Sequence, residues 1–319
     1  MPDNTPVINT VLGPVPADQL GPTEVHASLL SVVPGAEYAP DITINRAEIF
    51  EILKHKLTAF HNAGGRTIVD ASGMFHGRNL PITLPMLENL ATATGVNIIA
   101  STGMGPEDLL GGYFLTPQTN PPTPWPAEKF ADLFSKEITE GMVVPRVERR
   151  APAGLIVTLS TESGMTATDE SLLRGAVRAS LATGVAVSHT FGADLLAEID
   201  IALDEGIAPE RLVVRGVGRR QAPVLEAAAR GVYLGIDQAG RGDDTARIAL
   251  LNKLIDAGYT HRIILSSSAI GVAKGHEAPA VEFGSLFTNV LPTLRNAGAT
   301  DADIIQITET NPRDLLAID

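Results

Sequence analysis

The chain contains the stretch Val213-Val214-Arg215-Gly216-Val217-Gly218-Arg219-Arg220, in which a short β-branched run leads into glycines and arginines. Such a run, bounded by glycine, is typical of a buried strand in a parallel sheet. The eight segments of this character lie at Val25–Val32, Thr67–Ser72, Asn97–Thr102, Gly154–Ser160, Ala186–Thr190, Arg211–Val217, Val232–Asp237 and Arg262–Ser268. The helical patterns between them include Arg46–Asn62, Pro126–Glu140, Glu170–Thr183, Ala193–Glu205, Thr245–Ala257 and Phe283–Asn296.

Eight strands, each followed by a helix, predict an α/β fold of the (β/α)8 TIM-barrel type. A chain of 319 residues has the length of one such barrel, so we expect a single domain over residues 1–319. The site of a TIM barrel lies at the C-terminal ends of its strands. Near the end of the chain, Thr300-Asp301-Ala302-Asp303 predicts the start of the last helix and Asn311-Pro312 its end.

Charge and composition exclude several classes of function. A formal net charge of −13 argues against a nucleic acid or an anionic membrane surface as the partner. The chain has no cysteine, so it has no disulfide, no thiolate metal site and no cysteine nucleophile. The first residues lack the pattern of a signal peptide, and no apolar run approaches about 18 residues. A cytoplasmic location is therefore expected.

The segment between residues 103 and 126 has a different character. It follows the third predicted strand and contains the run Asn120-Pro121-Pro122-Thr123-Pro124-Trp125-Pro126. Its prolines exclude regular structure and stiffen the loop. Because it follows a strand end, it should lie over the barrel mouth, where it is a substrate lid, a subunit contact or an ordered surface loop.

Several phrases occur in a particular order along the chain. They are Thr10-Val11-Leu12-Gly13-Pro14-Val15-Pro16, Leu20-Gly21-Pro22-Thr23, Gly64-Gly65-Arg66-Thr67-Ile68-Val69-Asp70, Gly95-Val96-Asn97-Ile98-Ile99-Ala100-Ser101-Thr102-Gly103, Tyr233-Leu234-Gly235-Ile236-Asp237 and Asn311-Pro312-Arg313. In this combination the chain resembles the phosphotriesterase family of the amidohydrolase superfamily, from end to end. The resemblance implies a barrel with two divalent metals at its mouth, hydrolytic chemistry and a homodimer.

The family's metal ligands are mostly replaced in this chain. The family holds its metals with a His-x-His, a carboxylated Lys or a Glu, two further histidines and an Asp. The matching positions here are His26-Ala27-Ser28, Val157 or Thr158, His189, Val217 and Ser266-Ser267-Ser268. The alignment at His189 needs a short deletion, which leaves open the face of the strand that this side chain occupies. Two histidines and some hydroxyls are too few ligands for a metal pair, so no metal and no other cofactor is predicted.

Charged side chains are the candidates for chemistry without metals. Residues two apart on a strand share a face, so an inward Val217 places Arg215 inside the barrel as well. A buried arginine needs a partner. Arg215 therefore either binds a substrate carboxylate or carbonyl, or forms a structural ion pair with one of three acids: Asp70, Glu162 or Asp237.

These considerations give two sets of candidate residues. The catalytic candidates are His26, His189, Asp237 and Arg215. The candidates for ligand binding are Ser28, Thr158, Glu162, Arg219, Gln238, Ser266, Ser268 and Trp125. Each has a structural alternative, such as a hydrogen-bonded core histidine or a solvated loop charge.

The leading hypothesis is a metal-independent enzyme that acts on a small ester, lactone or carboxylate-bearing molecule by acid–base chemistry. The alternatives are a non-catalytic small-molecule-binding pseudoenzyme and a structural partner of an active homologue. In the enzyme and in the binding protein, the partner is a small-molecule substrate or ligand.

Overall fold

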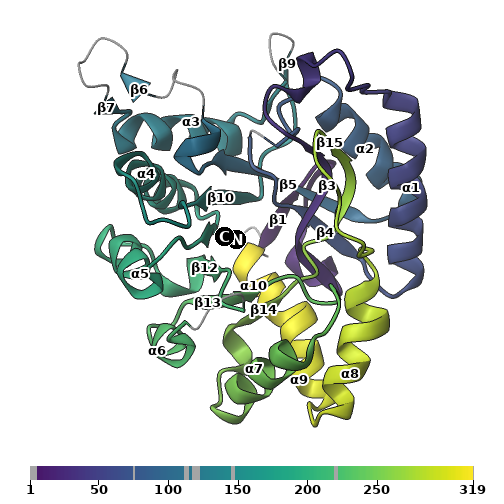
Figure 1. Ribbon diagram of the computed structural model, residues 1–319, viewed down its shortest axis with the longest axis vertical. Helices are drawn as coiled ribbons and strands as arrows, with labels where there is room; N and C mark the ends of the chain where they lie inside the picture. The colour runs from purple at the N-terminus through teal and green to yellow at the C-terminus, as the bar shows by residue number, and fades with distance from the viewer. Residues whose placement is uncertain are drawn as a thin grey trace, which may run out of the picture.

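The computed structural model describes residues 6–74, 76–110, 115–116, 123–144, 148–218 and 222–318. Its central feature is a parallel sheet with the strand order β14-β13-β12-β11-β10-β5-β4-β3-β15. In chain order these strands are β3 (Thr23–Val32), β4 (Thr67–Asp70), β5 (Asn97–Met104), β10 (Leu155–Leu159), β11 (Val187–Thr190), β12 (Leu212–Arg215), β13 (Tyr233–Ile236), β14 (Ile263–Leu265) and β15 (Ile270–Lys274). The sheet curls and helices surround it on the outside, as in a (β/α)8 TIM barrel (Figure 1).

The barrel closes between β14 and β3 through a side chain. β14 and β15 are consecutive in the chain but lie at opposite ends of the strand order, so residues 266–269 cross the seam. Beyond the seam, β15 pairs with β3 from Ile270↔Ser28 to Lys274↔Val32. At the seam itself, the backbone N–H of Ser267 donates to the Glu24 carboxyl oxygen Oε1 at 3.0 Å. Glu24 of β3 therefore binds the segment that follows β14, where the described residues form no ladder between β14 and β3.

The outer layer consists of helices. They are α1 (Arg46–Asn62), α2 (Thr83–Thr94), α3 (Ala127–Thr139), α4 (Ala167–Thr183), α5 (Leu195–Asp204), α6 (Val224–Ala229), α7 (Thr245–Asp256), α8 (Leu291–Asn296), α9 (Asp301–Ile305) and α10 (Asn311–Leu316). Four of them, α1, α4, α5 and α9, begin with a side-chain cap. The Asn45 side chain caps α1 by accepting from the amides of Ala47 and Glu48. Thr166 and Thr300 form capping boxes with the aspartate three residues further on.

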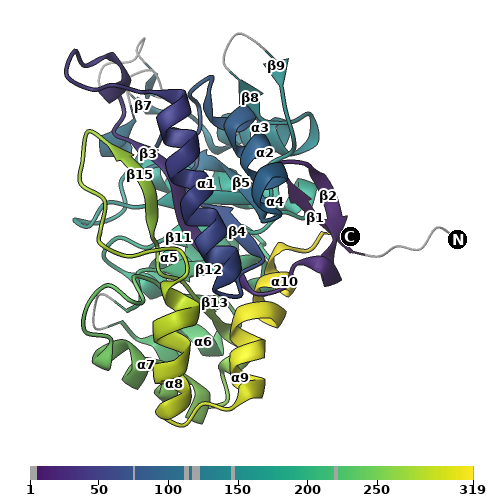
Figure 2. The same cartoon turned by 90° about the vertical axis from the view of Figure 1, so that its right-hand side faces the viewer.

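Short strands and helical turns lie at both ends of the barrel. The hairpin of β1 (Val7–Thr10) and β2 (Gly13–Pro16) lies beside Ile318, so the first and last described segments are on the same side (Figure 2). Two further antiparallel pairs join β6 (Leu115–Thr116) to β7 (Thr123–Pro124) and β8 (Val143–Val144) to β9 (Glu148–Arg149). The remaining turns are 3-10 helices at Ala17–Gln19, Ala36–Tyr38, Glu107–Leu109, Pro209–Arg211 and Thr260–Arg262, and π-helical turns at Leu286–Val290 and Gln306–Thr310.

Two hydrophobic clusters reveal which strand residues face inward. The inner cluster includes Val25, Val69, Ile99, Leu155, Val157, Ala186, Val213, Tyr233 and Ile264. It is closed at the N-terminal end of the barrel by Ile8, Leu20 and Leu315. The outer cluster lies between the sheet and the helices and contains the alternate strand residues, among them Ile68, Ile98, Ile156, Val187 and Val214. This alternation assigns a face to every polar side chain discussed below.

The predicted barrel is confirmed, and most element bounds agree within a few residues. The prediction that Asn311-Pro312 ends the last helix is wrong. After Thr310 the chain continues as α10, and the preceding π-helical turn Gln306–Thr310 accommodates the proline. Within the described residues, no helix combines the length and the apolar character that crossing a bilayer requires.

Candidate functional site

His26 lies at the centre of a buried polar series inside the barrel. The pairing register of β3 shifts between Glu24 and Ala27, and the His26 side chain enters the interior there. Its Nε2 lies 3.0 Å from Ser188 Oγ, and its Nδ1 lies 3.4 Å from Asp237 Oδ1. The second approach is long for a hydrogen bond. His26 is only 1% exposed, so these two side chains are its polar environment.

Arg215 continues the series toward the mouth of the barrel. It is in register with Thr190 and Gly235, on the inner face of β12. Its Nε donates to Asp237 Oδ2 at 3.0 Å, so Asp237 is the partner among the three predicted acids. The side chain is 12% exposed, and its two terminal nitrogens donate to no residue of the described ranges. Arg215 is therefore an anchored cation that still presents N–H donors.

The charge states within this series follow from burial. Burial, followed by the positive charge of Arg215, lowers the pKa of His26 from 6.5 to about 4. The imidazole is therefore neutral at pH 7. Asp237 Oδ1 faces Nδ1 of His26 without a hydrogen bond, and its negative charge favours the tautomer with the proton on Nδ1, which leaves Nε2 to accept from the Ser188 hydroxyl.

Glu24 forms a second buried group at the barrel seam. Burial raises its pKa from 4.5 to about 7, against hydrogen bonds from Ser266 and Ser267 that lower it. Ser266 Oγ contacts the Glu24 carboxyl, lies 3.1 Å from the His26 carbonyl oxygen and accepts from the Ser268 amide at 3.0 Å. A protonated Glu24 donates to Ser266 Oγ, which is then free to donate to the His26 carbonyl. The neutral acid therefore matches the donors and acceptors at the seam.

His189 does not belong to the barrel interior. It is in register with Thr158 and Val214, whose face packs against the helices. Its Nδ1 lies 2.8 Å from Thr158 Oγ1 and its Nε2 lies 2.8 Å from Glu198 Oε2 on α5. The predicted catalytic place of His189 and the predicted ligand contact of Thr158 are therefore both corrected. A strand has period two, so the short deletion before His189 turns it to the outer face and Ser188 inward.

Glu198 is held ionised by this outer contact. Burial alone raises its pKa, but the hydrogen bond and charge of His189, together with the Gly192 amide, outweigh burial and lower it. The Gly192 amide donates to both carboxyl oxygens, at 3.0 and 3.1 Å. This arrangement fixes the loop after β11 and engages both ring nitrogens of His189.

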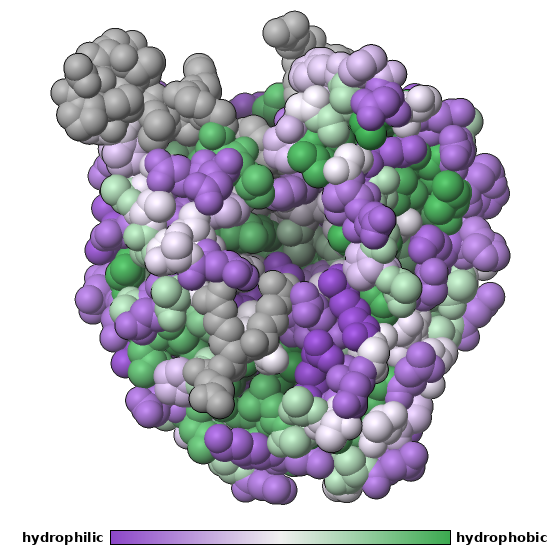
Figure 3. Space-filling view, in the orientation of Figure 1, coloured by the Kyte–Doolittle hydropathy of each residue, from purple (hydrophilic) through white to green (hydrophobic). Residues whose placement is uncertain are grey.

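A pocket of about 550 Å³ opens at the C-terminal ends of β10, β11 and β12. It is lined by Pro106, Asp108, Leu109, Leu159, Ser160, Thr161, Glu162, Ser163, Thr190, Phe191 and Gly216. The face seen in Figure 3 is hollowed near its centre. Thr190 and Gly216 are the register partner and the chain neighbour of Arg215, so the pocket lies directly beyond the buried series.

The other predicted ligand-binding residues are dispersed. Glu162 lines the pocket, whereas Ser28 Oγ bonds to Ser72 at 2.7 Å and Ser266 belongs to the seam. Gln238 and Ser268 follow β13 and β14 with left-handed backbone at φ 63° and 49°. Trp125 packs against Phe130 at 5.5 Å, with the Lys129 ammonium over its ring. Arg219 lies outside the described residues.

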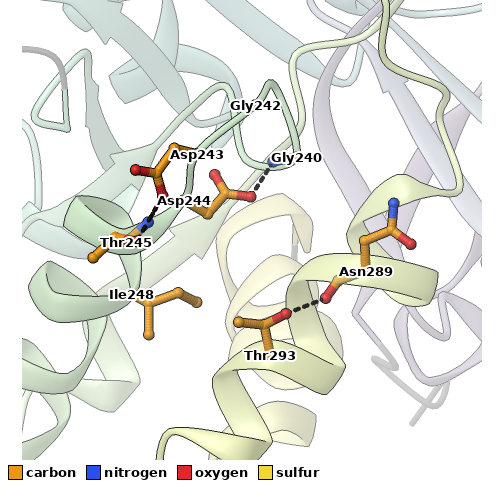
Figure 4. A pocket seen from close by; sticks show the side chains of 8 residues that line it. All are labelled: Gly240, Gly242, Asp243, Asp244, Thr245, Ile248, Asn289 and Thr293. Carbon is orange, nitrogen blue, oxygen red and sulfur yellow. Dashed lines mark hydrogen bonds between the residues drawn. The ribbon is translucent and has the colours of Figure 1, made fainter.

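A second pocket, of about 420 Å³, lies at the start of α7 (Figure 4). Its polar groups bond to one another: the Gly240 amide donates to Asp244 and the Thr245 amide to Asp243. Asp244 also accepts from Arg247 at 2.7 Å, and Arg247 Nε donates to the Asp237 carbonyl at 2.9 Å. This loop therefore fixes the backbone of Asp237.

The residues at the family's ligand positions do not fit a pair of divalent metals. His26 Nε2 is engaged by Ser188 and Nδ1 faces only Asp237, and the inner-face side chains nearby include Val157 and Val213. In the part of the chain that the structure describes, no three His, Cys, Asp or Glu residues are grouped as metal ligands. A binuclear centre needs about three or four such ligands for each ion.

Three residues of the site were not identified from the sequence: Ser188, Glu24 and Arg247. Glu24 could have been identified, because it directly precedes an apolar strand and an acid buried there needs a specific partner. Ser188 is next to His189, so only the facing of β11 distinguishes them. Arg247 gave no signal, because it lies in an ordinary helix start.

Comparison with known proteins assigns the class. The model of the phosphotriesterase family matches residues 6–316, and the chain belongs to this family. A phosphotriesterase homology protein of Mycobacterium tuberculosis is 25% identical over 97% of both chains. A phospho-furanose lactonase of Mycoplasmopsis synoviae is 25% identical, over 97% of this chain and 91% of its own.

The fold has a close match among solved structures. A structure from work on organophosphate hydrolysis activity engineered from a weak promiscuous lactonase superimposes with a TM-score of 0.81 and 24% identity. The match covers 97% of this chain and 99% of the other. At this identity the likeness supports the barrel fold alone.

Proposed function

We propose that this protein is a metal-independent enzyme that acts on a small carbonyl compound, an ester, lactone or carboxylate-bearing molecule, by acid–base chemistry. The observation that carries the proposal is the series His26–Asp237–Arg215, of which His26 stands at a metal-ligand position that the resemblance implies. Membership of a family with hydrolase and lactonase relatives supports an ester or lactone. The pocket beyond Arg215 has room for a small organic molecule.

Each residue of the series has a distinct role in this proposal. The terminal nitrogens of Arg215 bind the carbonyl or carboxylate oxygen of the substrate, and the Asp237 carboxylate anchors the guanidinium. His26 is the neutral base that accepts a proton, and Asp237 stabilises the imidazolium that forms. Because this interior is buried, Arg215 stabilises negative charge there more strongly than in bulk solvent.

The proposal is tested with a panel of small lactones and esters, assayed with chelator and after elemental metal analysis. We expect less than about 0.1 metal equivalent per chain and turnover that chelator leaves unchanged. Arg215→Lys removes the guanidinium fork and should lower kcat/KM by about tenfold or more. The matched control Arg230→Lys changes an arginine outside the series, whose Nη1 bonds to Leu196 O. Turnover that appears only with added zinc, manganese or cobalt contradicts the proposal.

The burial of His26 and Asp237 favours a second candidate, a non-catalytic small-molecule-binding protein. Both side chains are almost inaccessible, whereas Arg215 and the pocket are open. In that case carboxylates and lactones bind with an affinity that Arg215→Lys weakens, but no variant and no substrate shows turnover. Calorimetry on the same panel separates the two functions.

A further inference from the structure

Ser188 places its hydroxyl against the His26 ring, and the roles above leave it unused. It lies on the inner face of β11, in register with Val157 and Val213. Its Oγ is 3.0 Å from His26 Nε2. The series is therefore Ser188–His26–Asp237, with side chains from three different strand regions and Arg215 bound to the far oxygen of the aspartate.

The polarity of this series is set by Arg215. Its guanidinium donates to Asp237 Oδ2, and the other oxygen, Oδ1, faces His26 Nδ1 at 3.4 Å without a hydrogen bond, which favours the tautomer with the proton on Nδ1. Nε2 then carries the lone pair and accepts the hydroxyl proton of Ser188. This is the tautomer that a serine nucleophile requires, with the base against the hydroxyl and a carboxylate facing the other ring nitrogen.

We propose that Ser188 is the nucleophile of a covalent acyl-transfer reaction; this inference rests on the proposed function. Ser188 Oγ forms a bond to the substrate carbonyl carbon while its proton passes to His26 Nε2. The tetrahedral intermediate collapses as the carbon–oxygen bond of the ester or lactone breaks, and the leaving oxygen takes the proton from Nε2. Water then attacks the acyl carbon and gives a proton to His26, which returns it to Ser188 Oγ as the acid product leaves.

The architecture restricts the substrates that reach Ser188. Two residues along β11 toward the mouth, a rise of about 6.6 Å, Thr190 lines the open pocket together with Leu159 of β10. Ser188 itself is fully buried below this layer. Thr190, Leu159 and Arg215 are the partly exposed side chains of this layer, so the proposal requires a substrate to pass between them to reach Ser188. The site should therefore accept thin acyl groups and exclude branched or aromatic ones.

Covalent labelling of the full chain tests the proposal. We expect methanesulfonyl fluoride, a small probe, to release fluoride and sulfonylate Ser188, detected by intact mass and peptide mapping. Phenylmethanesulfonyl fluoride should react at least about tenfold more slowly, because its aromatic group does not pass the Thr190 layer. Ser188→Ala should abolish the label, whereas Ser180→Ala, which removes another buried serine on α4, should leave it unchanged.

Two outcomes separate this inference from the proposed function. If Ser188→Ala turns over substrate as fast as the wild type, and the wild-type protein takes no label on Ser188, the nucleophile is overturned and the acid–base enzyme stays intact. A label on Ser188 without turnover of any ester supports the nucleophile and overturns the proposed function. The variant Ser188→Cys retains a nucleophile of similar size, so its thiol should be alkylated by iodoacetamide in the folded protein. A Ser188→Cys protein with unchanged Tm whose thiol stays unalkylated also overturns the proposal.

Discussion

Replacing Glu24 by Gln should change how the stability of this protein depends on pH. The folded-state pKa of Glu24 is about 7, above its ordinary value of 4.5, because the carboxyl is buried. The stabilisation from its neutral form is fully present below pH 4.5 and is lost as the pH rises through 7. Gln does not ionise, so it removes this loss while it still accepts from the Ser267 amide and donates to Ser266.

The size of the effect follows from the shift in pKa. Between pH 5 and pH 8, the wild type should lose about 2 to 3 kcal/mol of unfolding free energy through Glu24. For a chain of 319 residues, this corresponds to roughly 3 to 4 °C in Tm. His26 acts in the opposite direction, because its pKa of about 4 makes it stabilise above pH 6.5 and destabilise as the pH falls through 4. The effects of Glu24 and His26 on the pH dependence of the unfolding free energy partly cancel in the wild type. In Glu24→Gln, only the effect of His26 remains of these two.

The measurement is a pair of thermal unfolding curves at each pH from 4 to 9, for the wild type and Glu24→Gln. The Tm of Glu24→Gln minus the Tm of the wild type should increase as the pH rises. This increase is expected whether the variant is more or less stable than the wild type at any single pH. Glu51→Gln is the matched control, because Glu51 is exposed on α1 and its exchange should leave the pH dependence of the wild type unchanged. A Glu24→Gln curve parallel to the wild-type curve between pH 5 and pH 8 refutes the protonated Glu24 at the seam.

Three further variants test separate features. Arg78→Met should cost about 3 to 5 kcal/mol in urea unfolding, because it leaves Glu137 as a buried acid without its ion-pair partner; a cost below about 1 kcal/mol contradicts the buried pair. His189→Ala should lower the unfolding free energy by about 1 to 3 kcal/mol and leave kcat unchanged, because His189 faces the helices. A large loss of kcat at unchanged Tm would mean that His189 belongs to the site. Gly103→Ala should cost about 1 to 3 kcal/mol by the same measurement, because φ is +93° and a Cβ overlaps the Val157 carbonyl; a neutral variant contradicts that geometry.

The barrel was predictable from the sequence, because eight apolar runs alternate with helical patterns and one architecture satisfies that order. The inward place of Arg215 was also predictable, since period two fixed it once the strand was identified. The facing of His189 was not predictable. A deletion of uncertain position before it decides between the two faces of β11, and apolar neighbours fit either face equally. Ser188 remained hidden for the same reason.

The seam at Glu24 depends on contacts that are distant in the chain. Glu24 and Ser267 are 243 residues apart in the chain. No local sequence pattern predicts that the Glu24 side chain binds the segment after β14 in place of backbone ladder bonds. The end of the last helix shows a related limit. Proline usually ends a helix, but Asn311 here donates to the carbonyls of Thr260 and Ile263, so tertiary contacts hold the helix through Pro312.

The electrostatics of the interior connect the lost ligands with the proposed chemistry. The Arg215 cation is paired with the Asp237 anion. The pKa values of Glu24 and His26 beside them are shifted in the directions that favour the uncharged form of each side chain. Below pH 7 these four side chains carry no net charge among them. A divalent ion added there would meet Asp237, which is already paired with Arg215, and Glu24, which would have to lose its proton, so its binding is costly in a buried site. A neutral substrate carbonyl does not carry this cost, and Arg215 is required to stabilise charge only as it develops on the carbonyl oxygen. Arg215→Met should accordingly weaken binding of a neutral lactone less than it lowers kcat, whereas equal losses in binding and turnover contradict this role.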